Sequence, residues 1–170
     1  LGFENGDGDP GTANISRRGS TGWTLEVTGT PAHSSQVFRA DIGPGAIFEA
    51  ARILTAFYQE LRDEDLLTFN PGRILGGTTV EHDDAANAGI AFGKNNVIAE
   101  TAIVTGDIRA ISIEQLERVR TRMSAIVADN YPHTSATISF GEGYPPLAPA
   151  QGNRELLGLY SAASIDLGQG

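Results

Sequence analysis

The residues of this chain best suited to hydrogen bonding and proton transfer at neutral pH are its three histidines, His33, His82 and His133. His33 lies in the segment GTPAHSS, residues 29–35, directly after an expected strand. The small residues around it would let the imidazole stand clear of the surface. A surface histidine in a turn is the plainer interpretation, and composition alone favours it. A Ser-His-Asp hydrolase fits poorly, because the chain has no G-x-S-x-G motif.

The other two histidines have simpler interpretations. His82 opens the sequence HDD, whose spacing matches some zinc sites, so a small metalloenzyme using His82, Asp83 and Asp84 is one hypothesis. Catalytic zinc needs three protein ligands and an open position, and no second histidine lies nearby in the sequence, so a solvated loop is favoured. His133 follows a Tyr-Pro pair and is expected to be a turn residue at a helix exit.

Asn96 and Arg109 form a second candidate site. Asn96 belongs to NNVIAE, residues 95–100, which leads into the clearest expected strand, and Arg109 lies within that strand. Arg109 should face away from Ile108, on an exposed face or at an interface, where its planar guanidinium suits a carboxylate. Asp107 is expected on the same face as Arg109. An ion pair within the strand is therefore the alternative that the residues alone favour.

Hydrophobic periodicity predicts the strands that would position these residues. Alternating apolar residues predict strands at residues 22–28, 73–81, 101–111 and 136–140. The sequence NPG at residues 70–72 predicts a turn that opens the second of these strands. Residues 83–87 are expected to form a polar loop.

The same analysis predicts three helices. The first follows Pro44, a residue tolerated in a first helical turn. Its apolar face is expected to contain Ile47, Ala50, Ala51, Leu54, Phe57 and Leu61. The second opens with the capping-box pattern SIEQ, residues 112–115, and stops at Pro132. A short third helix is expected at residues 153–164.

The order of these elements predicts the fold. Strand, helix, strand, strand, helix, strand is the order of an α+β, ferredoxin-like βαββαβ domain. Four strands would form an antiparallel sheet, and two helices would cover one of its faces. One sheet face and an edge strand would stay uncovered, and a second copy of the domain could supply the cover.

Composition limits the class of protein. The chain has 170 residues, 40% of them apolar, which is enough for one domain with a core. Its net charge of -9 argues against nucleic acid and anionic membranes as partners, since both need a basic face. The chain has no cysteine, which excludes disulfides and cysteine-ligated metals. Both ends of the chain are expected to be cut sites within a longer protein. The composition does not distinguish a cytoplasmic from a periplasmic protein.

Taken in order, several segments resemble the small domain of the zinc exopeptidase superfamily that contains glutamate carboxypeptidase, peptidase T, aminoacylase and succinyl-diaminopimelate desuccinylase. The similarity is nearest to the glutamate carboxypeptidase branch. The matching segments are RG at 18–19, GTPAHSS at 29–35, GAIFEAARIL at 45–54, GGT at 76–78, NVI at 96–98 and DIR at 107–109. Each segment alone is weakly specific, whereas the ordered set is specific. Ala99 departs from the family, which often has proline there.

The resemblance implies a division of the chain. Residues 15–145 would be the dimerisation, or lid, domain, residues 1–14 a leader from the preceding catalytic segment, and residues 146–170 the start of the return into the catalytic domain. In such enzymes a separate domain holds two zinc ions, so this chain is expected to hold no cofactor and to be inactive alone. The whole enzyme would hydrolyse C-terminal amide bonds of small peptides or N-acyl amino acids.

The resemblance also implies roles for single residues and partners. The domain would dimerise with a second copy through its edge strand and a helix. His33 would reach the partner's active site and donate a hydrogen bond to the oxyanion of the tetrahedral intermediate. Arg109 and Asn96 would bind the free carboxylate of the substrate. A free-standing ferredoxin-like regulatory module that binds a small amino acid or anion is the alternative function.

Overall fold

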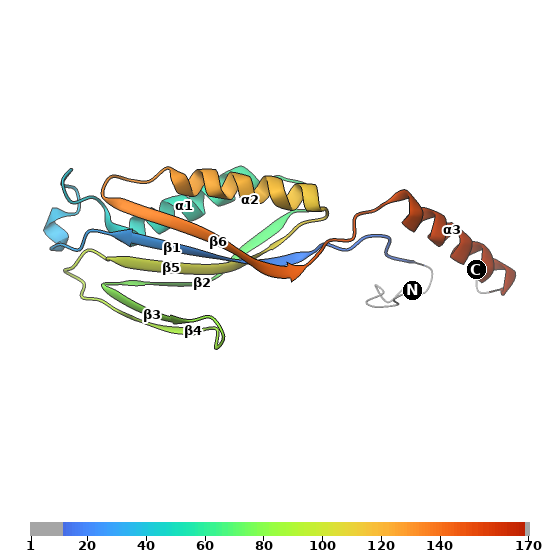
Figure 1. Ribbon diagram of the computed structural model, residues 1–170, viewed down its shortest axis with the longest axis horizontal. Helices are drawn as coiled ribbons and strands as arrows, with labels where there is room; N and C mark the ends of the chain where they lie inside the picture. The colour runs from blue at the N-terminus through green and yellow to red at the C-terminus, as the bar shows by residue number, and fades with distance from the viewer. Residues whose placement is uncertain (1–11, 169–170) are drawn as a thin grey trace.

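The computed structural model describes residues 12–168 and contains the expected ferredoxin-like fold. Its sheet is antiparallel with the order β2-β5-β1-β6. The four strands are β1 (Ser20–Gly29), β2 (Thr68–Gly77), β5 (Thr101–Arg109) and β6 (Thr134–Tyr144). Two helices, α1 (Gly45–Leu61) and α2 (Ile113–Ala128), cover one face of this sheet (Figure 1).

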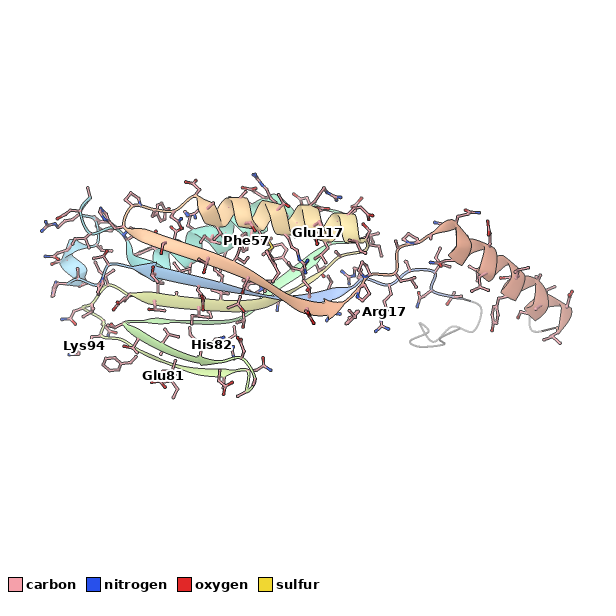
Figure 2. The ribbon with its side chains drawn as sticks, viewed as in Figure 1. Arg17, Phe57, Glu81, His82, Lys94 and Glu117 are labelled. Carbon is pink, nitrogen blue, oxygen red and sulfur yellow. The ribbon has the colours of Figure 1, made fainter. Side chains whose placement is uncertain are left out.

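The core lies between the sheet and the two helices. Every second residue of β1 from Thr21 to Val27 is buried against the helices, as are Ala102, Val104 and Ile108 of β5, in agreement with the alternation of apolar and polar residues. Figure 2 shows Phe57 pointing from α1 into this layer, where its ring meets that of Trp23 edge to face at a centroid distance of 6.0 Å. The largest buried apolar residues are Trp23, Leu25, Phe57, Ile53, Ile108 and Met123.

The expected apolar face of α1 is partly wrong. Ala50, Phe57 and Leu61 are buried as predicted, but Ile47 and Ala51 are exposed, and Ala46 and Ile53 enter the core instead. The helix has two adjacent apolar stripes, each with helical spacing, and periodicity cannot choose between them. The core stripe is 46, 50, 53, 57 and 61, whereas the stripe 47, 51, 54 and 58 lies beside it, with Ile47 over Gly76 of β2.

The turn predicted at residues 70–72 is wrong, because β2 runs through it. Pro71 and Gly72 lie inside the strand, and the register with β5 shifts between Pro71 and Arg73. Proline is tolerated here because β2 is an edge strand and the register shift beside Pro71 is a β-bulge. The bulge keeps Arg73 beside Thr105 and Ile74 beside Val104.

A hairpin that the sequence did not predict follows β2. The strand expected at 73–81 divides at Thr78, and the chain continues as β3 (Thr79–Asp83) and β4 (Ala88–Phe92), which pair with each other. His82 therefore lies in a strand and not in a polar loop. The hairpin lies on the side of the sheet that the helices leave open (Figure 1). Its second strand gave no signal, because every residue of β4 is exposed and none alternates in burial.

The remaining elements follow their predicted sequence signals. Ser112 caps α2 by accepting a hydrogen bond from the backbone N of Gln115 at 3.1 Å, and Gln115 Oε1 accepts from Ile111 N. A third helix, α3 (Gln151–Asp166), lies away from the sheet beyond the end of β6 (Figure 1). None of the helices in residues 12–168 is long and apolar enough to cross a membrane.

The strands that lead into and out of the sheet run side by side. Arg17 N donates to Leu147 O at 2.9 Å, and Leu147 N donates to Arg17 O at 2.8 Å. Both lie at the end of the sheet next to α3, and the short 3-10 helix η1 (Ser34–Gln36) lies at the opposite end (Figure 1). The domain thus has a two-stranded neck, formed around Arg17 and Leu147, and a far end formed around η1.

Candidate functional site

His33 occupies the far end of the domain with its side chain exposed. It is the N-cap of η1, and its Nδ1 accepts a hydrogen bond from Ser35 N at 3.2 Å and lies 2.9 Å from Ser35 Oγ. Since Nδ1 accepts, the neutral ring carries its proton on Nε2. Within residues 12–168 Nε2 has no hydrogen-bond partner, so the ring presents a free donor to whatever approaches this end.

Asn96 lies next to the His33 loop. Ser34 N donates to Asn96 O at 2.9 Å, Ile98 N donates to Ala32 O at 2.8 Å, and His33 forms an isolated bridge with Val97. Both His33 and Asn96 have exposed side chains. The structure therefore brings together two of the three predicted site residues.

Gly45 allows this juxtaposition. It has φ +80°, and a Cβ built on it would lie 2.3 Å from Ile98 Cγ2, so both the backbone and the space require glycine. Next to it, Ala46 N donates to Ala99 O at 3.0 Å. The start of α1 is thus fixed to the segment that carries Asn96, and Ala99 is held by its carbonyl.

Arg109 lies at the other end of β5, near the neck. β5 begins at Thr101, beside the Asn96 segment, and ends at Arg109, so the two ends are about 26 Å apart at the usual rise per residue. The Arg109 side chain is half exposed, on the sheet face opposite the helices. Within one chain Arg109 therefore does not meet His33 or Asn96.

The expected ion pair between Arg109 and Asp107 is present. Arg109 Nε donates to Asp107 Oδ2 at 3.0 Å, and this hydrogen bond, followed by the charge of Asp107, raises the pKa of Arg109 above its ordinary value. Both side chains keep contact with solvent, so the pair contributes little to stability. It leaves Nη1 and Nη2 of Arg109 able to bind a carboxylate.

The remaining histidines do not form a metal site. His82 Nε2 lies 2.7 Å from Asp84 Oδ1, whereas Asp83 Oδ1 accepts from Ala86 N in the hairpin turn. His133 has φ +60° and its Nε2 lies 2.9 Å from Ala40 O, as fits a turn residue. Among residues 12–168 no three His, Asp or Glu side chains are grouped to hold a metal ion, so this part of the chain does not fit a zinc site.

A further exposed surface lies where α1 flanks the edge strand β2. Ile47, Tyr58 and Ile74 are large apolar residues that are each about half exposed, and with Ala51 they form the α1–β2 surface along one edge of the sheet. Ile74 shares the helix face of the sheet with its neighbour Val104. The second apolar stripe of α1 was the sequence signal for this surface.

Comparison with known proteins decides the family. Residues 15–135 match the family model described as the peptidase dimerisation domain. This match covers most of the chain. The chain belongs to the peptidase dimerisation domain family. A comparison with curated protein sequences finds no match.

Solved structures agree with this peptidase dimerisation domain. Aminopeptidase PepT from Bacillus cereus is 16% identical with a TM-score of 0.59, over 91% of this chain and 37% of that one. A tripeptidase from Staphylococcus aureus is 15% identical with a TM-score of 0.57, over 91% and 36%. A hydantoinase/carbamoylase family amidase from Burkholderia vietnamiensis is 18% identical with a TM-score of 0.58, over 90% and 33%. The chain thus spans about a third of the length of these proteins and shares their fold over that part.

Proposed function

We propose that this domain joins two copies of a larger metallopeptidase or amidase and contributes His33 to the active site of the partner subunit. The family match supports self-association, and the greater length of the structural relatives supports a separate catalytic part. The observation that carries the proposal is the exposed His33 at the far end of the domain, with its Nε2 donor free.

A second copy would cover the α1–β2 surface. Ile47, Tyr58 and Ile74 are exposed there, and large exposed apolar groups at a sheet edge are typical of an interface. The opposite edge is more polar, because β6 is flanked by α2, whose outer side carries charged residues such as Glu117, labelled in Figure 2. This difference favours β2, and not β6, as the edge strand of the predicted dimer.

His33 would stabilise the oxyanion that forms when water attacks the scissile amide. A donor held in place before the reaction loses little entropy, and Ser35 fixes the ring through Nδ1 while Nε2 points outward. Removing one such donor typically lowers the rate by about two to three orders of magnitude. The attacking water would be activated by zinc ions held outside this chain, since its described residues offer no ligand set.

The substrate carboxylate would be held between two subunits. Asn96 precedes the start of β5 and Arg109 ends it, and the two ends of β5 are about 26 Å apart, which is too far for both side chains of one chain to bind one carboxylate. Antiparallel pairing of two β2 edges about a twofold axis places the far end of one domain beside the neck end of the other. Arg109 of one subunit and Asn96 of its partner can then serve the same site, together with the partner's His33.

The substrate class follows from this arrangement and from the structural relatives. A free carboxylate beside a scissile amide fits a small peptide or an N-acyl amino acid, and a glutamate carboxypeptidase-like activity is one member of this class. The domain boundaries 15–145 stay a prediction, close to the residues 15–135 of the family match. Alone, the chain is proposed to be inactive.

Mixed dimers of the full-length enzyme test the proposal. One subunit carries His33→Ala and the other Arg109→Ala, each of which should inactivate its own homodimer. In the mixed dimer one active site has both residues and the other has neither, so purified mixed dimers should regain about half the activity of the unchanged enzyme. If both residues served the same subunit, every site would lack one of them and mixing would restore nothing, which would disprove the arrangement.

A further inference from the structure

The open face of the sheet carries a polar row that the proposed function does not use. Arg73 lies beside Thr105, Thr105 beside Thr24, and Thr24 beside Ser139, so one residue from each of the four strands lies in register. The four residues line a hollow of about 380 Å³, which is bordered by Asp84 and Asn87 of the hairpin. The row therefore consists of three hydroxyl groups with a guanidinium at one end.

Arg73 has unused hydrogen-bond donors. Its Nη2 donates to His82 Nδ1 at 3.1 Å, which leaves the proton of the neutral His82 ring on Nε2; this atom lies 2.7 Å from Asp84 Oδ1 but makes no hydrogen bond to it. Among residues 12–168 this is the one hydrogen bond of the Arg73 side chain, whose Nη1 is buried without an acceptor and which forms no ion pair. Figure 2 shows His82 between the hairpin and the sheet.

The guanidinium of Arg73 is half-buried and has no carboxylate partner among residues 12–168, although the chain has a net charge of -9. Buried N–H donors are nearly always paired, and leaving one unpaired is unfavourable. The planar guanidinium matches the two oxygens of a carboxylate, and the hydroxyls of Thr105 and Thr24 can hydrogen bond to the rest of a small polar molecule. The hollow has the size of a site for a small ligand.

We propose that Arg73, with Thr105, Thr24 and Ser139, forms a binding site for a small carboxylate. The carboxylate would belong to a free amino acid or to the C-terminus of a peptide. The site is separate from the proposed function, because Arg109 lies four residues further along β5, about 13 Å from Thr105.

The test is a titration of the isotope-labelled 170-residue chain, followed by the amide signals of Thr24, Thr105 and Ser139. Sodium acetate should produce saturable shifts at these three residues, whereas acetamide and sodium chloride at the same concentrations should not. Arg73→Gln should weaken acetate binding about ten- to a hundred-fold, since a charge-assisted pair is lost. Arg109→Gln should leave it unchanged, which separates this site from the proposed substrate site.

A second variant and a pair of related ligands complete the titration experiment. Ser139→Ala changes an exposed residue and should not disturb folding, and we expect it to weaken acetate binding severalfold. This variant keeps the proposal testable if Arg73→Gln fails to fold. Tighter binding of glycine than of N-acetylglycine would identify a free amino acid, and the reverse order a peptide C-terminus. Equal shifts with sodium chloride, or acetate binding that survives Arg73→Gln in a folded chain, would overturn the proposal.

Discussion

The backbone N–H of Ser34 donates a 2.9 Å hydrogen bond to the carbonyl oxygen of Asn96. This bond joins the loop after β1 to the segment before β5, and with the bridge between His33 and Val97 it makes one rigid end of the domain. The side chains of His33 and Asn96 are both exposed there. A partner that approaches this end meets both at once.

If the proposed function holds, replacing His33 should affect the chemical step of the full-length protein. His33→Ala is expected to lower kcat about a hundred- to a thousand-fold with little change in KM, because the donor acts on the transition state and not on the bound substrate. Steady-state kinetics measures this. His133→Gln is the matched control, since glutamine can still donate to Ala40 O, and it should keep kcat. A large rise in KM with unchanged kcat for His33→Ala would contradict the role in catalysis.

The proposed dimer edge can be tested by placing a charge at each of the two edges of the sheet, one formed by β2 and the other by β6. Ile47→Asp puts a carboxylate on the α1–β2 surface and should weaken dimerisation about a hundred-fold, because a buried charge would need a partner. Thr137→Asp on the exposed side of β6 should have little effect. Light scattering after size exclusion measures both. Dissociation by Thr137→Asp but not by Ile47→Asp would assign the interface to β6.

The parts of the fold governed by burial were predictable from the sequence. Trp23, Leu25 and Val27 alternate with polar residues, and their burial in β1 is confirmed. The sequence could not predict which apolar stripe of α1 enters the core, because both stripes have helical spacing. The packing of α1 on the neighbouring strands determines which one is buried. The exposed strand β4 has no burial pattern to detect.

The candidate site was predictable to a smaller extent. The exposure of His33 follows from the small residues of its loop, whereas its position beside Asn96 depends on backbone bonds between distant segments. The separation of Asn96 from Arg109 was available from strand geometry, because the residues between them are mostly extended. The resemblance assigned Asn96 and Arg109 to one carboxylate and did not consider the length of the strand between them.

Gly45 should be intolerant of any side chain. Gly45→Ala has to adopt φ +80° and places a methyl group against Ile98, so it should lower the free energy of unfolding by about 2–4 kcal/mol. Gly158→Ala in α3 is the control, as nothing lies within 4 Å of its Cβ and alanine favours the helix. Urea unfolding measures both. Equal effects of the two substitutions would refute the proposed packing of Gly45 on Ile98.

Glu49 is a fully buried carboxylate whose charge is paired. Its oxygens accept from Arg52 Nη2 at 2.6 Å and from Tyr131 N at 3.1 Å. Glu49→Ala leaves Arg52 and the Tyr131 backbone without their acceptor and should cost about 3–5 kcal/mol of stability. The double variant Glu49→Met, Arg52→Met should recover part of this loss, since an apolar pair replaces the charges. Thermal unfolding of both variants checks the expectation.

The exposed pair of Arg39 and Asp41 predicts a dependence on pH. The hydrogen bond from Arg39 lowers the pKa of Asp41 below its ordinary value, so the pair stabilises the loop above the unfolded pKa and loses that effect as pH falls through the folded one. Arg39→Gln should raise the pKa of Asp41 toward its ordinary value. A carboxyl titration by NMR measures this shift, and an unchanged value in the variant would show that the pair is absent in solution.

Because the neck at Arg17 and Leu147 lies at one end of the domain and His33 at the other, a small rotation at the neck would displace His33 by a large distance. Arg17 and Leu147 are joined by a pair of hydrogen bonds, and the chain from Arg17 to the end of β1 at Gly29, beside the His33 loop, spans about 40 Å. A rotation of about 10° at the neck would therefore sweep the imidazole through about 7 Å. The stiffness of the neck, far from the proposed reacting atoms, would therefore determine how precisely the His33 imidazole is positioned.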